Sequence, residues 1–285
     1  MRLVVLDSVS DPAKPAAEND DRIGWNATAA FVIDGATNLA ESLIAPPASD
    51  AAWIAELARE TLEAGLAPER SLRDVVRMLC TMARDRFNAA AGPSVERYRH
   101  PNAGFQSLRL TTEGIEIAGL ADCTLFLKDG AGAVTRYSGL RSGRSAEQSS
   151  ARTALTRQGG LNADGEAFRD AETLAMLRAS RSRMNTEGGV WTLGIHPEAA
   201  SHIRIERPPI VLPATGMLCT DGFADIVDNY GLCTALELID RAEAEGLGAL
   251  LAKIRRIERE IDPDGLQFPR FKRSDDASAI LVRLS

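Results

Sequence analysis

The spacing of hydrophobic positions changes several times along the chain, and each period predicts one kind of element. Near the start, apolar and partly β-branched runs bounded by polar or small residues predict strands at 3–10 and 27–36. The spacing then becomes helical, because residues 49–64 and 71–89 place apolar side chains three and four positions apart behind a capping serine. Two strands followed by two amphipathic helices are therefore expected.

A period of two follows over residues 105–139, with turns at Glu113-Gly114 and Asp129-Gly130, and predicts an antiparallel meander. The remaining expected elements are strands at 189–195, 202–212 and 216–222, helices near 232–244 and 247–261, and a last strand at 278–285. Blocks of antiparallel strand separated by blocks of helix indicate an α+β layered domain rather than a parallel sheet. Pairs of helices are expected to cover the outside of a β core.

Residues 139–189 interrupt this pattern. They are polar, rich in Ser, Arg and Gly, and contain one expected helix near 170–180. A long polar stretch between regular elements is typical of a surface excursion, so this segment is the candidate for a mobile flap. Its arginines, in "LRSGRS" and "RASRSR", fit a solvated face or the substrate side of such a flap.

The amino-acid composition narrows the classes of protein to which this chain can belong. The 285 residues, 45% of them hydrophobic and 26% charged, are enough to bury a sizeable core. A net charge of -7 leaves no basic stripe of the kind that binds nucleic acid or an anionic membrane. An acidic protein that handles an anion needs a local cation to do so.

Cysteines and apolar runs indicate the compartment. The four cysteines lie far apart without a C-x-x-C pair, which argues against a zinc site and a disulfide framework and predicts free thiols. The first residues carry too short an apolar run for a signal peptide, and no stretch approaches the roughly 20 apolar residues of a membrane span. We expect a cytoplasmic protein.

Aspartates recur at or beside the ends of expected strands. The set is Asp20 and Asp21 in "ENDDR", Asp34 in "FVIDGA", Asp122 in "GLADC", Asp221 in "CTDGFAD" and Asp275 in "KRSDDAS". Any one Asp-Gly after a strand is more often an ordinary turn. Carboxylates gathered at one rim repel one another, however, and a hard divalent cation with oxygen ligands relieves that repulsion. The glycines after Asp34 and Asp221 suit a backbone that closely approaches an ion.

In chain order, "NDDR", "FVIDG", "GLADCTLFL", "MLCTDGFADIV" and "SDDASAILVRL" resemble the successive motifs of the protein phosphatase 2C-like, PPM-type, metal-dependent phosphatases. The resemblance spans about residues 18–284 and implies a single domain over 1–285. It implies a four-layer α-β-β-α sandwich, in which a central antiparallel β-sandwich is flanked by helices and carries the metal centre at one end.

The resemblance also implies roles for the acids. Asp34 would bridge two Mn²⁺ or Mg²⁺ ions, and the carbonyl of Gly35 would bind one of them; Asp221 and Asp275 would bind the other. Asp20 and Asp21 would act through the metal-bound water, Asp122 would help to hold a third ion, and Asp225 would support Asp221. The implied enzyme hydrolyses phosphoserine and phosphothreonine with metal-activated water, and works as a monomer with a phosphoprotein substrate and a cognate kinase as partners.

Several positions depart from the family pattern. "DGATN" lacks the two glycines that follow the first acid motif, Ala121 replaces a glycine, and Asp276 replaces an asparagine. The nearest upstream cation is Lys14, which is out of register with the family's phosphate-binding arginine. His100, His196 and His202 are expected to lie apart from one another and from the acids.

Two other functions remain open. The first is a degenerate member of the same fold that binds or regulates without turnover. The second is an aspartyl-phosphate hydrolase of the haloacid dehalogenase type, suggested by "FVIDGAT"; it lacks the second acid, since Ala36 stands there, and the alternating helix-strand pattern of that fold.

Overall fold

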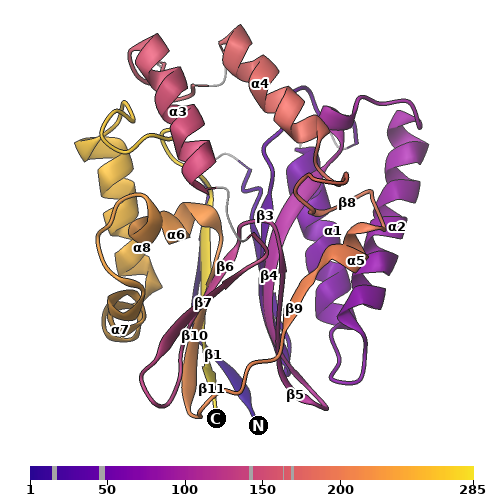
Figure 1. Cartoon of the computed structure of the whole chain (residues 1–285), viewed down its shortest axis with the longest axis vertical. Helices are drawn as coiled ribbons and strands as arrows, with labels where there is room; N and C mark the ends of the chain where they lie inside the picture. Colours follow the sequence, from indigo (N-terminus) through magenta and orange to yellow (C-terminus); the bar gives the residue numbers. More distant parts are fainter. Residues whose placement is uncertain (15–17, 45–48, 141–143, 163, 168–169) are drawn as a thin grey trace.

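The computed structural model describes residues 1–14, 18–44, 49–140, 144–162, 164–167 and 170–285. In this part of the chain, two antiparallel sheets face each other (Figure 1). One sheet has the order β1 (Leu3–Asp11), β11 (Ala277–Leu284), β10 (Ala214–Cys219), β6 (Thr124–Lys128) and β7 (Val134–Ser138). The other has the order β2 (Arg22–Trp25), β3 (Ala29–Gly35), β4 (Asn102–Thr111), β5 (Gly114–Leu120) and β9 (Arg204–Glu206), with β8 (Leu193–Gly194) paired to β4.

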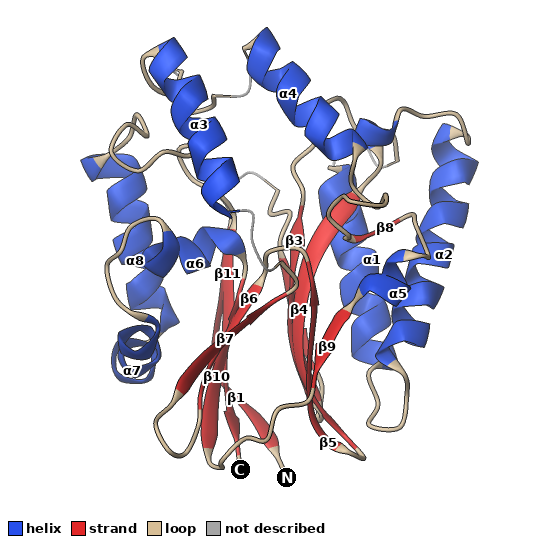
Figure 2. Ribbon diagram, viewed as in Figure 1, coloured by secondary structure: helices blue, strands red, loops and turns tan. Residues whose placement is uncertain are grey.

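Helices cover both outer faces of this sandwich, as Figure 2 shows. The β3–β4 sheet carries α1 (Asp50–Gly65), α2 (Leu72–Ala91) and the short α5 (Ala199–His202). The β10–β11 sheet carries α6 (Asp221–Asp228), α7 (Ala235–Glu245) and α8 (Leu247–Arg256). Short helical turns lie at η1 (Arg97–Arg99) and η2 (Ile257–Ile261). The expected four-layer α+β sandwich is confirmed, and its antiparallel sheets differ from the parallel sheet of a haloacid dehalogenase.

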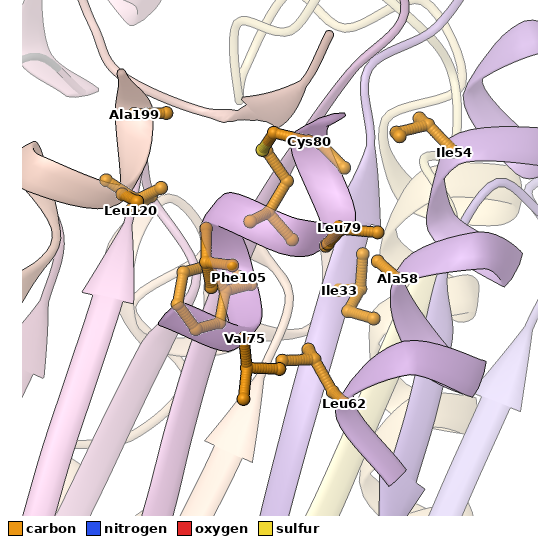
Figure 3. Close-up of a cluster of buried hydrophobic side chains, with 14 of the residues drawn as sticks. Ile33, Ile54, Ala58, Leu62, Val75, Leu79, Cys80, Phe105, Leu120 and Ala199 are labelled. Carbon is orange, nitrogen blue, oxygen red and sulfur yellow. The ribbon is translucent and has the colours of Figure 1, made fainter. Parts of the chain in front are cut away.

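Three apolar clusters hold the four layers together. The first joins α1 and α2 to the β3–β4 sheet and includes Ile33, Leu62, Leu79 and Phe105 (Figure 3). The second packs α6, α7 and α8 on the other sheet, and the third fills the space between the two sheets. Because both faces of each sheet are covered, the central strands β3, β4 and β10 are buried along almost their whole length.

The helix predictions are accurate within a few residues where the apolar stripe is strong. Helix α1 begins after Ser49, whose hydroxyl accepts a hydrogen bond from the backbone of Ala52, and α2 begins after Ser71. The structure also contains α3 (Arg144–Gln158), which was not predicted because its sequence is polar and has no clear apolar stripe. Helix α4 (Ala171–Ser182) matches the expected helix near 170–180.

The strand predictions need four corrections. The meander over 105–139 is split, since β4 and β5 belong to one sheet and β6 and β7 to the other. The strands expected at 189–195 and 202–212 shrink to β8 and β9, the latter ending before two prolines that cannot donate to a ladder. Strand β10 ends at Cys219, and Asp221-Gly222 opens a helix instead of closing a strand. Strand β2, which begins at the last residue of "ENDDR", was missed.

The excursion over 139–189 lies beyond one end of the sandwich. Both α3 and α4 stand above that end rather than on a sheet face, at the end opposite the chain termini (Figure 1). Residues 141–143, 163 and 168–169 of this segment lie outside the described residues. Its role as a flap stays a prediction. None of the helices in the described ranges is long and apolar enough to cross a membrane.

Candidate metal centre

The predicted acids meet at the end of the sandwich below α3 and α4. Strand β3 delivers Asp34 one residue before its end, α6 begins with Asp221, and Asp275 stands two residues before β11. Asp122 lies in the connection that passes from β5 to β6, and therefore from one sheet to the other. Asp21 directly precedes β2. Antiparallel pairing thus gathers acids that are up to about 250 residues apart in the sequence.

Burial and mutual repulsion both act on this group. The pKa of Asp34 is raised well above its ordinary value of 3.8, first by burial and then by the charges of Asp221, Asp21, Asp122 and Asp275. The pKa of Asp21, which is 2% exposed, is also raised by burial and by neighbouring carboxylates. Four carboxylates acting on the half-buried Asp34 show that these acids lie close together.

Two polar contacts fix the geometry between the sheets. The hydroxyl of Thr220 donates to Asp21 Oδ2 at 2.8 Å and accepts from the backbone N–H of Ser278 at 3.0 Å. This hydroxyl is therefore engaged with Asp21 and does not cap α6. At the first residue of α6, the backbone N–H of Asp221 points at Asp34 Oδ2 over 3.5 Å. The N-terminus of α6 is thus directed at the acids.

Asp20 lies at the margin of the group, beside Asp276. Asp276 accepts the backbone N–H of Ala13 at 2.7 Å on Oδ1 and that of Asp20 at 2.6 Å on Oδ2, while Ser49 donates to the Asp20 carboxylate. Burial and the charge of Asp276 raise the pKa of Asp20 to about 6, against the lowering effect of the Ser49 bond. The aspartate that replaces the family's asparagine therefore orders the segment that carries Asp20.

Two glycines stand where the backbone has no room for a side chain. A Cβ on Gly35 would lie 2.5 Å from the carbonyl oxygen of Asp20, and one on Gly222 would lie 2.2 Å from that of Asp276. Such separations are well below van der Waals contact, so both positions require glycine. Both close approaches join segments on which the acids sit.

Asp122 is placed by an unusual backbone turn. Ala121 has a φ of 60°, in the left-handed region where glycine is usual. Asp122 Oδ1 lies 3.2 Å from where a Cβ on Gly104 would be, and the buried Cys123 thiol has its pKa raised by burial and then by Asp34 and Asp122. The alanine that departs from the family pattern therefore adopts the conformation that a glycine would. All four cysteines are buried free thiols, as predicted.

The cations of this region were not recognised in the sequence. Lys14 pairs with Glu166 at 2.9 Å on the surface. Lys272 instead reaches the acids, donating to Asp275 Oδ1 and to Thr37 Oγ1, each at 2.6 Å. Its spacing of three residues from Asp275 was the available signal, but its contact with Thr37 has no local signature.

Arginines of α4 approach the same loop from above. Arg178 donates to the carbonyl of Leu39 at 2.8 Å, and Arg181 to those of Ala36 and Thr37 at 3.3 Å. Burial lowers the pKa of Arg181 to about 10. The sequence "RASRSR" was expected to be a solvated face or the substrate side of a flap. Two of its arginines instead attach α4 to the loop that follows Asp34.

The histidines were expected to lie apart from one another and from the acids, and the first part of this prediction is wrong for His100 and His196. His100 Nδ1 lies 3.2 Å from His196 Nε2, and the ring of His202 stacks on Trp191 with centroids 3.7 Å apart. They pack beside α2 and α5, since Phe87 of α2 contacts the His100 ring edge to face. Their neighbours in these contacts are other rings rather than the acids.

The donor set suits a hard divalent cation. The converging side chains offer carboxylate oxygens, and their mutual repulsion is the kind of energy that an ion of charge two relieves. In the described ranges, no group of three or more His, Cys, Asp or Glu side chains is already arranged around a position for a metal ion. The chemistry fits the implied ions, and the carboxylates would have to close on them.

The fold is that of the PPM-type serine/threonine phosphatases. The Mycobacterium tuberculosis serine/threonine phosphatase PstP/Ppp shares it with a TM-score of 0.57 and 13% identity over 100% of both chains. The catalytic domain of the serine/threonine phosphatase PstP, in complex with two manganese ions, has a TM-score of 0.57 and 14% sequence identity to this chain. The match covers 99% of this chain and 98% of that chain.

The PPM Ser-Thr phosphatase MsPP of Mycobacterium smegmatis, in complex with cacodylate, gives a TM-score of 0.54 and 14% identity over 98% of each chain. No protein-family model and no curated protein sequence matches the chain. The suspected resemblance is thus confirmed at the level of the fold, over the whole length.

Proposed function

We propose that the protein is a metal-dependent phosphatase that hydrolyses phosphoserine and phosphothreonine in proteins. The observation that carries this proposal is that Asp21, Asp122, Asp221 and Asp275 converge on Asp34 at one end of the sandwich. Unbalanced buried charge of this kind costs several kcal/mol unless a cation offsets it. The shared fold with phosphatases, one of them holding two manganese ions, supports the same conclusion.

In this proposal, Asp34, the carbonyl of Gly35, Asp221 and Asp275 hold two Mn²⁺ or Mg²⁺ ions. Asp122 can take part in a further, weaker site. Bound divalent ions would supply a water of lowered pKa and positive charge for the phosphate oxygens. Asp20 and Asp21 would accept hydrogen bonds from that water, with Asp21 oriented by the hydroxyl of Thr220.

The same arrangement explains how an acidic chain could bind a phosphate dianion. With a net charge of -7, the protein as a whole repels such a substrate, so positive charge must be concentrated at the site. The approach of the α6 N-terminus toward Asp34 adds a partial positive charge there. The substrate would be a phosphoprotein made by a cognate kinase, and the enzyme would act as a monomer.

Hydrolysis of p-nitrophenyl phosphate and of a phosphothreonine peptide tests the proposal. The purified protein is stripped with a chelator and then supplied with Mn²⁺, Mg²⁺ or no metal. Metal-dependent release of phosphate, lost in Asp34→Asn, is the expected result. A folded, manganese-supplied sample that releases no phosphate from either compound would contradict it.

A degenerate module with the same fold is the second candidate. It is favoured by one observation, that no described group of three acids, histidines or cysteines already surrounds a metal position. Calorimetry separates the two candidates, since a module that has lost its metal centre would release no heat of Mn²⁺ binding.

A further inference from the structure

The loop after Asp34 and the segment before Asp275 are joined by one lysine. Lys272 Nζ donates to Asp275 Oδ1 and to Thr37 Oγ1 at 2.6 Å, and its side chain is 24% exposed. Thr37 occupies one of the positions where the family motif has glycine, so its hydroxyl exists only because of that departure. The altered "DGATN" loop and Lys272 therefore form one structural unit.

The charge of Lys272 acts on the whole margin of the acid group. Burial disfavours its ammonium, but Asp275, Asp276 and Asp221 outweigh burial and raise its pKa. In return, Lys272 offsets a part of the rise that burial and neighbouring charges cause in the pKa values of Asp20 and Asp276. The ammonium thus places a positive charge beside several carboxylates and donates directly to one of them, Asp275.

Other cations nearby are engaged elsewhere. Arg255 donates to the backbone carbonyl of Asp275, not to its carboxylate, and its charge is matched by Asp11 and Glu258. Arg22 donates to the backbone carbonyl of Asp21 and pairs with Glu56. Among the ion pairs described, the side chain of Asp275 is bonded to Lys272.

We infer that Lys272 is a built-in counter-cation that competes with a divalent ion for Asp275. Two cations that share one carboxylate repel each other, so each weakens the binding of the other. The lysine would stabilise the metal-free protein and hold the loop at Thr37 in place, at the expense of metal affinity. This inference rests on the proposed metal centre for the divalent ion, but the role of Lys272 in the metal-free protein does not depend on it.

The test compares three variants. Lys272→Met removes the charge and keeps the length of the side chain, Lys272→Arg keeps the charge, and Lys253→Met makes the same charge change at a lysine paired with Glu245 on the surface of α8. Each protein is stripped of metal, titrated with MnCl₂ by calorimetry, and melted with and without chelator.

Lys272→Met is expected to bind Mn²⁺ about tenfold tighter or to take up an additional ion, because the repulsion between neighbouring cations is removed. Its melting temperature in chelator is expected to fall below that of Lys253→Met. Lys272→Arg should follow the wild type in both measurements. Unchanged or weaker Mn²⁺ binding by Lys272→Met, with wild-type binding intact, would overturn the competition.

The two proposals can fail separately. If no variant binds Mn²⁺ but Lys272→Met still melts lower than Lys253→Met, the metal-dependent function falls and the counter-cation role stands. If Lys272→Met behaves as Lys253→Met in both measurements while the wild type binds Mn²⁺, the inference about Lys272 falls and the proposed metal centre stands.

Discussion

Charged side chains gather near both ends of strand β4. Near one end positive and negative charges are paired, whereas near the other end carboxylates predominate. At its Thr111 end, Arg109 and Glu116 form an ion pair at 2.6 Å, with side chains 4% and 1% exposed. Arg207 adds a second cation to Glu116, and the carbonyl of Arg70 accepts from Arg109. At the other end, near Gly104, several carboxylates meet, and Lys272 contacts one of them, Asp275.

This difference separates a structural charge cluster from a site that requires something more. At the Arg109–Glu116 pair every charge has a partner within the protein, so the pair needs no ligand. At the acid end, the pKa values of Asp21 and Asp34 are raised first by burial and then by the charges of neighbouring carboxylates. Excess of one sign in a buried place is the feature that indicates a binding site.

Neutralising one acid should affect the enzyme most. Asp34→Asn is expected to reduce metal-dependent phosphate release by at least about 100-fold, because it removes the proposed bridging ligand. In chelator the same variant should melt above the wild type, since one of the repelling charges is gone. Activity assays and thermal melts check both, with Asp85→Asn on the exposed face of α2 as the matched control. A variant that melts lower in chelator would mean that the acids do not repel one another.

Neutralising Glu116, near the Thr111 end of β4, should instead destabilise the protein and leave metal binding unchanged. Glu116→Gln leaves Arg109 buried without its counter-ion, which is expected to cost about 3–5 kcal/mol of unfolding free energy. Urea denaturation measures this, and Mn²⁺ affinity should stay that of the wild type. A loss below about 1 kcal/mol would show that the carbonyl contacts of Arg109 suffice.

The stability of the metal-free protein should depend on pH because of the acid end of the sandwich. Since the pKa of Asp20 is about 6 in the folded state and 3.8 ordinarily, the folded state binds more protons between these values. Asp20 therefore contributes stability that is present at low pH and lost as the pH rises through about 6. The contribution is at most about 2–3 kcal/mol. Chemical denaturation from pH 7 to pH 4 should show it, and Asp20→Asn should lack it.

A further pH effect is expected at the histidine pair, away from both charged ends. Burial, then Arg97 and His100, lower the pKa of His196 from 6.5 to about 4. Between these values the unfolded chain binds more protons, so stability is present above pH 6.5 and falls as the pH drops toward 4. His196→Gln should flatten this slope in the same denaturation series. An unchanged slope would mean that a group other than His196 causes the pH dependence of stability.

The local spacing of apolar residues predicted the helices and strands that have a continuous apolar face. Helices α1 and α2, the central strands and α7 follow from spacing that depends only on nearby residues. Helix α3 did not follow, and β8 and β9 are shorter than the expected strands, because these segments contribute few apolar side chains of their own and depend on neighbours for their shape. Tertiary context overrides propensity in such segments.

The candidate site, like the fold, could be predicted only in part from the sequence. The sequence by itself determined which acids stand at strand ends, and the order of their motifs was enough to suggest the fold. Only the tertiary structure decided that Asp34 feels four other carboxylates, that the chain changes sheets at Asp122, and that Lys272 meets Thr37 from 235 positions away. The physical reason is that charge and hydrogen bonding act through space, whereas hydrophobic periodicity records only the faces of each element.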